Sequence, residues 1–163
     1  MTFKHLFPAN LYTAKRIGAL FIVAVCFAIT PVNSLHAEIK WNSYETGMNK
    51  ISEENLKGFL HFYTDWCTYC KKMNQETFSD DSVADYLNQN FVPIRINAEK
   101  QREVAKKYGV SRFPNNWFIS EDSSDIGSQP GFIPPDALLK MLQYINTDSF
   151  EDMSFQEFME TSQ

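Results

Sequence analysis

Short apolar segments alternate with segments of helical periodicity over most of this chain, and this alternation limits its fold more than any other feature. Three apolar runs have the length and composition of buried strands: 59–63, 92–97 and 116–120. Helical spacing and capping residues predict helices in five segments: 43–57 (closed by Gly58), 67–77, 79–87, 99–108 (stopped by Gly109) and 134–145. A polar turn at 121–127 leads to a last strand that ends near Phe132. We therefore expect an α/β fold with a mixed central sheet flanked by helices.

The N-terminal segment differs from the rest of the chain. Residues 1–19 carry three basic side chains and no acidic one, and an apolar run at 20–29 follows them. A basic start, a short apolar core and a small residue before a polar segment are typical of a secretory signal peptide. We expect residues 1–37 to be such a signal, cleaved after Ala37 or alternatively after Ser34, so that the protein acts in the periplasm. An uncleaved membrane anchor, with the domain facing the periplasm, is the alternative, although the run is shorter than the roughly 20 residues of a spanning helix.

Removal of this segment changes the charge of what remains. It takes away three basic residues and no acidic residue, so the formal charge of −5 becomes −8. This acidity argues against a nucleic-acid partner, which would require basic side chains to neutralise phosphates. The remaining length suits one domain, which we place at 38–147, followed by an acidic, amphipathic tail at 148–163. We expect the protein to be a monomer.

Of the three cysteines, Cys26 lies within the predicted signal. The other two, Cys67 and Cys70, form a Cys-x-x-Cys pair. A structural zinc site needs four ligands, and His61 is the one histidine left to join the two thiols. Haem attachment needs a histidine directly after the second cysteine, where Lys71 stands. Iron–sulfur clusters need about four thiolates. We therefore expect no metal and no bound cofactor.

A dithiol at the junction of a strand and a helix suits thiol–disulfide exchange. Near a helix N-terminus, free N–H groups and the helix dipole stabilise a Cys67 thiolate, which attacks a substrate disulfide to form a mixed disulfide. Cys70, one helical turn later, is placed to attack Cys67 and release the reduced substrate. The spacing does not choose between reduction and oxidation of the substrate. An inert disulfide remains an alternative, although so small a loop restricts the unfolded chain little.

Three segments together resemble the thioredoxin superfamily: Phe62-Tyr-Thr-Asp-Trp-Cys-Thr-Tyr-Cys-Lys-Lys-Met73, Tyr108-Gly-Val-Ser-Arg-Phe-Pro114 and Gly131-Phe132. Within the superfamily, Glu76-Thr-Phe-Ser-Asp80 is similar to the periplasmic thioredoxin-like proteins and to the C-terminal domain of the DsbD electron-relay family. The resemblance covers about residues 41–147 and implies a thioredoxin fold.

For the dithiol, the resemblance implies that Cys67 is the nucleophile, that Cys70 is the resolving thiol and that Trp66 shields them. One departure from the family lies six residues before the nucleophile, where relatives commonly bury an acid that helps to move the proton of the resolving thiol. His61 stands there, and the family's basic partner falls on Arg95. His61 is either a satisfied core residue or a proton acceptor for Cys70, since imidazole titrates near neutral pH.

For substrate binding, the resemblance points to the loops that face the dithiol. Pro114 matches the family's cis-proline, which leaves the backbone of Phe113 free to pair with an extended substrate. Gly131 matches a glycine that lets the substrate approach. Phe132 and Tyr69 supply further aromatic surface for a bound peptide.

We expect an exported thiol–disulfide oxidoreductase of the protein-disulfide reductase type. It would receive electrons from a membrane thiol donor and act on exported proteins that carry disulfides or cysteine thiols. The resemblance to electron-relay domains favours reduction, as does the absence of a histidine from Thr68-Tyr69 between the cysteines. The alternatives are a disulfide oxidase or isomerase, and a peptide-binding or chaperone module with secondary redox activity.

Overall fold

The computed structural model describes residues 36–161. The predicted signal peptide lies outside the described residues, apart from its last two positions, His36 and Ala37. Within 36–161, every helix is too short or too polar to span a bilayer.

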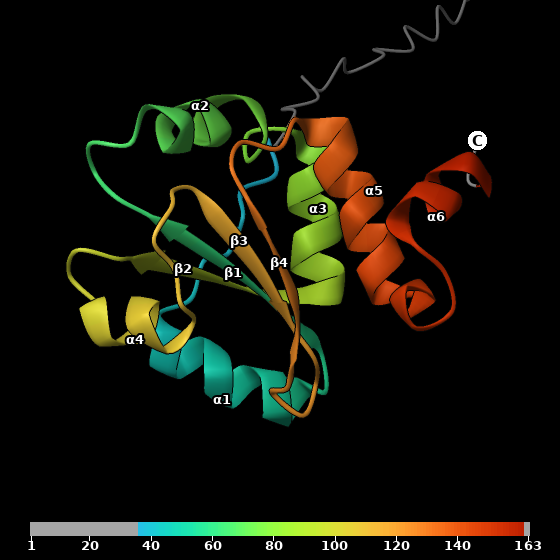
Figure 1. The fold of residues 1–163 in the computed structure, drawn as a ribbon, viewed down its shortest axis with the longest axis horizontal. Helices are drawn as coiled ribbons and strands as arrows, with labels where there is room; N and C mark the ends of the chain where they lie inside the picture. Colours follow the sequence, from blue (N-terminus) through green and yellow to red (C-terminus); the bar gives the residue numbers. More distant parts are fainter. Residues whose placement is uncertain (1–35, 162–163) are drawn as a thin grey trace, which may run out of the picture. The chain divides into compact units, whose positions relative to one another are not determined.

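The core of the domain is a mixed four-stranded sheet with the strand order β2-β1-β3-β4 (Figure 1). Its strands are β1 (Lys57–Tyr63), β2 (Phe91–Asn97), β3 (Asn115–Ile119) and β4 (Asp125–Pro130). β1 pairs in parallel with β2 and antiparallel with β3, and β3 pairs antiparallel with β4. This arrangement is the thioredoxin fold, and it confirms the expected α/β class and mixed sheet.

Helices cover both faces of the sheet (Figure 1). They are α1 (Tyr44–Glu54), α2 (Thr68–Glu76), α3 (Asp81–Asn90), α4 (Arg102–Lys107) and α5 (Pro135–Asn146). Side chains alternate between the faces along β1. Phe59 therefore packs in a core with α2, α3 and α5, whereas Leu60 and Phe62 pack in a second core with α1 and α4.

The first helix ends three residues earlier than the sequence predicts. Asn55, in the left-handed region at φ 52°, closes α1, and its N–H bonds to the carbonyl of Ile51. Gly58 does not end a helix but lies inside β1. A Cβ atom at that position would come within 2.5 Å of both Ile119 and Ile51, so the glycine is required by close packing rather than by a turn.

The fourth helix is shorter than predicted because a side chain competes for the first turn. Asn97 Oδ1 accepts hydrogen bonds from the backbone N–H groups of Glu99 and Lys100, at 3.0 and 3.3 Å. These bonds hold the segment after β2 in a turn, so α4 begins only at Arg102. After α4, Gly109 in the left-handed region, at φ +63°, turns the chain towards β3.

The C-terminal segment packs on its own domain. It forms a 3-10 turn, η1 (Ser149–Glu151), and a last helix, α6 (Phe155–Thr161). The rings of Phe155 and Phe158 pack against the ring of Tyr144 in α5, at centroid distances of 5.4 and 5.3 Å. The Tyr144 hydroxyl donates to the carbonyl of Met153 at 2.5 Å.

A buried lysine ties the start of β1 to two distant segments. The side chain of Lys57 is 5 % exposed, and its Nζ lies 2.7 Å from Glu121 Oε1 and 2.9 Å from Asp148 Oδ1. Burial disfavours its charged form, but the hydrogen bonds and charges of the two carboxylates outweigh this and raise the pKa of Lys57 above its ordinary value. The three groups join β1 to the β3–β4 turn and to the end of α5.

We expect loss of both carboxylates to destabilise the domain more than loss of the lysine. The double variant Glu121→Gln, Asp148→Asn leaves a buried ammonium unpaired, which costs about 3–5 kcal/mol. Lys57→Met keeps the apolar stem and leaves two carboxylates that reach water, with exposed fractions of 32 % and 53 %, so its cost should be smaller. Urea unfolding of both variants gives the comparison, and a larger loss for Lys57→Met would contradict it.

Candidate active site

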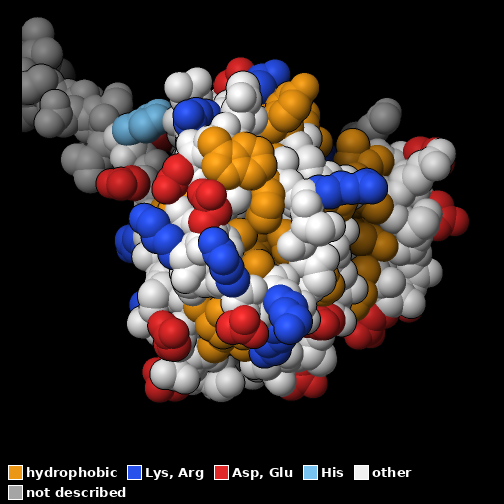
Figure 2. Space-filling view, turned by 60° about the vertical axis from the view of Figure 1, so that its left-hand side comes forward, with side chains coloured by type: hydrophobic (Ala, Val, Ile, Leu, Met, Phe, Trp, Pro, Cys, Tyr) orange, Lys and Arg blue, Asp and Glu red, His pale blue; other side chains and the backbone are white. Residues whose placement is uncertain are grey.

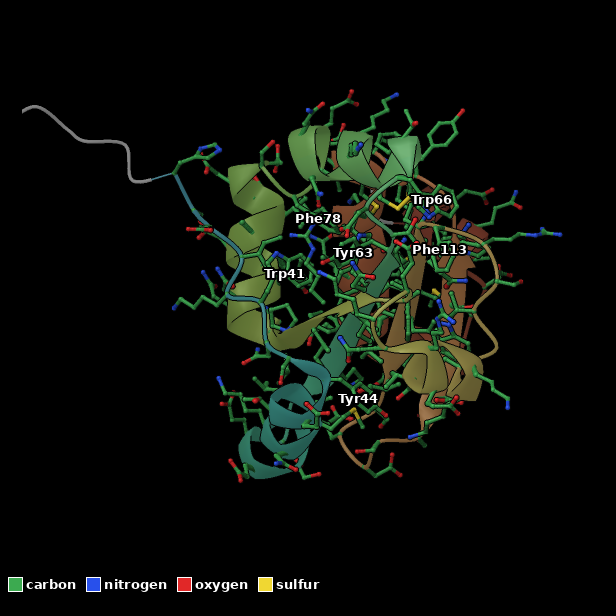
Figure 3. All side chains as sticks on the ribbon, turned by 90° about the vertical axis from the view of Figure 1, so that its left-hand side faces the viewer. Trp41, Tyr44, Tyr63, Trp66, Phe78 and Phe113 are labelled. Atoms are coloured by element: carbon green, nitrogen blue, oxygen red, sulfur yellow. A yellow bond between two sulfur atoms is a disulfide. The ribbon has the colours of Figure 1, made fainter. Side chains whose placement is uncertain are left out.

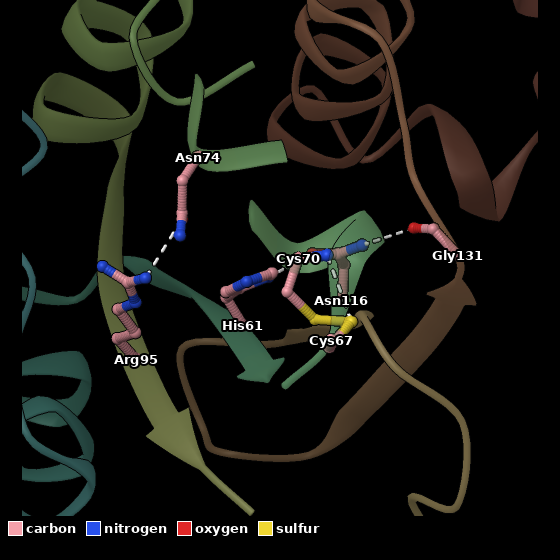
Figure 4. Close-up of a disulfide and its surroundings, with 7 residues drawn as sticks. All are labelled: His61, Cys67, Cys70, Asn74, Arg95, Asn116 and Gly131. Atoms are coloured by element: carbon pink, nitrogen blue, oxygen red, sulfur yellow. Dashed lines mark hydrogen bonds between the residues drawn. A yellow bond between two sulfur atoms is a disulfide. The ribbon is translucent and has the colours of Figure 1, made fainter. Parts of the chain in front are cut away.

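The two cysteines lie where β1 passes into α2 (Figure 4). Cys67 is the N-cap of α2, and its Sγ accepts the backbone N–H of Cys70 at 3.1 Å. A disulfide joins the two residues, whose Cα atoms are 5.2 Å apart. Both are largely covered, with exposed fractions of 4 % for Cys67 and 1 % for Cys70. The cysteine that caps the helix is therefore also the slightly more exposed residue of the pair.

An aromatic rim stands beside the disulfide. Trp66 and Tyr69 are the most exposed large hydrophobic residues of the described chain, at 67 % and 62 %. The Trp66 indole N–H donates to Glu99 Oε1 at 3.1 Å, and the ring meets Phe113 edge-on at 6.3 Å (Figure 3). Figure 2 shows hydrophobic side chains gathered on this face, with acidic and basic side chains around them. Such a surface suits contact with another polypeptide.

The loops that the family resemblance assigns to substrate binding are joined by a hydrogen bond. The Phe113–Pro114 peptide bond is cis. The backbone N–H of Gly131, which is at φ +95°, donates to the carbonyl of Pro114 at 2.7 Å. Phe132 is half-buried, and Lys72 Nζ lies 4.4 Å from the centroid of its ring. Gly131 and Phe132 therefore lie between the proline loop and α2.

A polar row crosses the sheet on the face that α2 covers. In the strand register, His61 of β1 lies between Arg95 of β2 and Asn116 of β3. His61 is fully buried, and its Nδ1 lies 2.8 Å from Asn116 Oδ1. Arg95 donates from Nη2 to Asn74 Oδ1 of α2 at 3.1 Å. Its guanidinium also lies 4.6 Å from the ring centroid of Tyr63.

His61 is held in its neutral form. Desolvation by burial lowers its pKa to about 4, and the nearby charge of Arg95 acts in the same direction. The hydrogen bond with Asn116 opposes this shift without cancelling it. At neutral pH the imidazole is therefore neutral, with one ring nitrogen protonated and a lone pair on the other.

A family model described as a thioredoxin-like domain matches residues 44–146, which is most of the described chain. The chain belongs to the thioredoxin-like family. This confirms the resemblance and places the Cys67–Cys70 pair in a family of thiol–disulfide oxidoreductases. Within 36–161, no cluster of three or more His, Cys, Asp or Glu side chains is arranged to hold a metal ion.

Several relatives of this thioredoxin-like domain have names that refer to thiol–disulfide chemistry. The Protein disulfide isomerase-like 5-2 of Oryza sativa subsp. japonica is 31% identical over 77 residues, which are 47% of this chain and 17% of the relative. The Thiol:disulfide interchange protein DsbD of Photorhabdus laumondii is 29% identical over 89 residues, 53% of this chain and 15% of the relative. The reduced DsbD C-terminal domain of Neisseria meningitidis superposes with a TM-score of 0.51 at 25% identity, covering 61% of this chain and 90% of that domain. The chain thus spans less than a fifth of the length of either curated relative.

Two polar residues of the thioredoxin-like site were missed as site residues by the sequence argument. Asn74 lies on α2 and binds Arg95, and Asn116 lies on β3 and binds His61. The alternation of β3 offered a signal for Asn116, because Asn116 and Phe118 share one face of the strand. Its contact with His61 depended on the register between β1 and β3, which composition does not supply.

Because the pKa of His61 is lowered by folding, we expect the stability of the domain to depend on pH. In the unfolded chain a histidine titrates near 6.5, so between about pH 6.5 and 4 the unfolded state binds a proton that the folded state excludes. Stability should therefore fall as the pH drops through this window, by up to roughly 3 kcal/mol. Urea unfolding of the oxidised protein, in which the cysteines do not titrate, measures the fall. His61→Leu should lose this part of the slope, and an equal slope in both proteins would refute the assignment.

Proposed function

We propose that this thioredoxin-like protein is an exported protein-disulfide reductase that works through Cys67 and Cys70. The observation that carries the proposal is the position of the Cys67 sulfur at the N-cap of α2, where it accepts the N–H of Cys70. In the reduced protein the same N–H groups and the helix dipole favour the Cys67 thiolate. The thiolate is the form that attacks a disulfide.

The proposed reaction has two exchange steps. The Cys67 thiolate attacks one sulfur of the substrate disulfide, which forms a Cys67–substrate bond and releases the other sulfur, to be protonated from solvent. Cys70 then gives its proton to His61 and attacks the Cys67 sulfur. This forms the Cys67–Cys70 disulfide and releases the second substrate sulfur, which takes up the transferred proton. Two electrons pass from the dithiol to the substrate, and a membrane thiol donor is proposed to return them.

The rim and the proline loop support a polypeptide substrate. We assign Phe113 and Pro114 to backbone pairing with an extended segment, and Gly131 and Phe132 to the opposite side of that segment. The two exposed aromatic residues, Trp66 and Tyr69, border the disulfide, so a segment bound there would place its own disulfide next to Cys67. Arg95 is assigned to the support of the buried row, through its bond to Asn74.

The direction and the place of the reaction are also proposals. The resemblance to electron-relay domains, and the lack of a histidine between the cysteines, favour reduction over oxidation or isomerisation. We propose that residues 1–37 are removed on export to the periplasm. Residues 38–147 would then be the catalytic domain, with 148–163 as a tail. The substrates would be exported proteins with disulfides or cysteine thiols.

The reduction potential separates a reductase from an oxidase. We expect a value near −270 mV, typical of thioredoxin, when the purified domain is equilibrated with glutathione buffers of known potential. A value near −120 mV, typical of a strong oxidant, would overturn the proposed direction. An intermediate value close to about −180 mV would instead favour an isomerase.

Loss of the resolving thiol should trap the substrate. In the Cys70→Ser variant the mixed disulfide on Cys67 has no internal attacker, so we expect covalent adducts that a thiol reductant releases. Cys67→Ser, the matched control, keeps one thiol of the pair but should trap far less. Mass spectrometry of adducts formed in the periplasm identifies the substrates. Full function in cells with both cysteines replaced by serine would instead favour a peptide-binding or chaperone module.

A further inference from the structure

We propose that Asn116 is a positioning residue that fixes the tautomer of His61, with the proton on Nδ1 and a free lone pair on Nε2. The inference deepens the proposed function and rests on it, because the free Nε2 is what would accept the proton of Cys70. It concerns a residue that touches neither sulfur nor substrate. Its effect on the reaction would pass through the histidine.

The orientation of the Asn116 amide is set by two backbone carbonyls. Its Nδ2 donates to the carbonyls of Gln129 and Gly131, at 3.2 and 3.4 Å. Rotation of the amide by half a turn would place Oδ1 against two other oxygens, and no hydrogen would lie between them. Asn116 is fully buried, so water does not replace the lost bonds. The oxygen of the amide therefore faces His61.

This orientation determines which imidazole nitrogen carries the proton. Asn116 Oδ1 accepts hydrogen bonds and donates none, and it lies 2.8 Å from His61 Nδ1. Nδ1 must then be the protonated nitrogen of the neutral ring, and Nε2 the unprotonated one. Nε2 is buried and has no hydrogen-bond partner among the described residues. A buried acceptor without a partner is uncommon and costs stability, which a role in proton transfer would explain.

The surroundings of the ring hold it in its neutral form. Phe78 and Trp41 enclose it at centroid distances of 4.8 and 6.1 Å, and Tyr63 stacks on it at 6.1 Å. Burial opposes protonation, as does the charge of Arg95 on β2, so the pKa of His61 stays near 4. Figure 4 draws the ring together with Cys67 and Cys70, whose thiols titrate once the disulfide is reduced.

The positioned tautomer fits the resolving step. The Cys70 thiol proton would move to Nε2, and the Cys70 thiolate would attack the Cys67 sulfur of the mixed disulfide. The imidazolium then donates from Nδ1 to Asn116 in a charge-assisted hydrogen bond, which is stronger than the neutral one. The proton leaves Nε2 with the released substrate sulfur, so His61 returns to its neutral form. With the other tautomer, Nε2 would carry a proton and accept none.

The tautomer itself is measurable without any variant. Long-range 1H–15N spectra of the imidazole distinguish a protonated from an unprotonated ring nitrogen, and His61→Gln assigns the signals. We expect Nδ1 to be protonated and Nε2 unprotonated at pH 7, in both redox states. A spectrum with the proton on Nε2 overturns the inference, whether or not any variant folds.

Two substitutions at position 116 test the effect on the reaction. Asn116→Leu removes the acceptor, so the Nδ1-protonated population should fall and mixed-disulfide resolution should slow by about 10-fold or more. Asn116→Asp keeps an acceptor, so the tautomer should persist, while its negative charge raises the pKa of His61. Asn88→Leu, on α3 away from the site, is the matched control and should leave both rates unchanged.

Single-turnover kinetics with a fluorescently labelled peptide disulfide separate the two steps. Slower resolution in Asn116→Leu, with formation of the mixed disulfide unchanged, supports the inference. An unchanged tautomer in Asn116→Leu, or an altered tautomer with an unchanged resolution rate, overturns it and leaves the proposed function standing. Resolution that survives in Cys70→Ser overturns the proposed function, and the inference with it.

Discussion

The domain depends on a single strand that is paired on both edges and covered on both faces. β1 bonds to β2 on one side and to β3 on the other, and its residues alternate between two hydrophobic cores. A strand in this position cannot shift by one residue, because every apolar side chain would then face the wrong core. Because β1 ends shortly before Cys67, the register of this strand also fixes the position of the dithiol.

The same strand places two unlike environments next to the disulfide. Outside, the aromatic rim is exposed and open to a partner polypeptide. Inside, His61 and Asn116 are fully buried beside a half-buried Arg95, and the row is linked by hydrogen bonds to α2 and to the end of β4. The cysteine that caps the helix lies towards the first environment, and the more deeply buried cysteine lies towards the second. Thiol exchange needs both, because one sulfur must meet a substrate and the other must lose a proton.

Much of this was predictable from the sequence, because periodicity and motif spacing are local properties. The strand and helix order, the mixed sheet and the cysteine pair all followed from patterns of fewer than twenty residues. Gly58 was misassigned because a glycine that closes a helix and one that lets two isoleucines approach look alike in sequence. The contact of Asn116 with His61 was beyond reach, since the two residues are 55 positions apart and meet only through the strand register. The predicted fourth helix began too early because the Asn97 side chain, at the end of the preceding strand, binds the backbone of the following turn. Helix propensity alone does not include such a hydrogen bond.

The ion pair at the start of β1 includes a residue that lies beyond the last helix covering the sheet. Asp148 comes after the last helix of the sheet-covering layer, yet it holds a lysine at the first position of the central strand. A chain shortened to residue 147 would keep every strand and every helix of the sandwich but leave that ammonium with Glu121 alone. The buried lysine is thus fully paired only when the chain extends one residue beyond Thr147, past the last helix that covers the sheet.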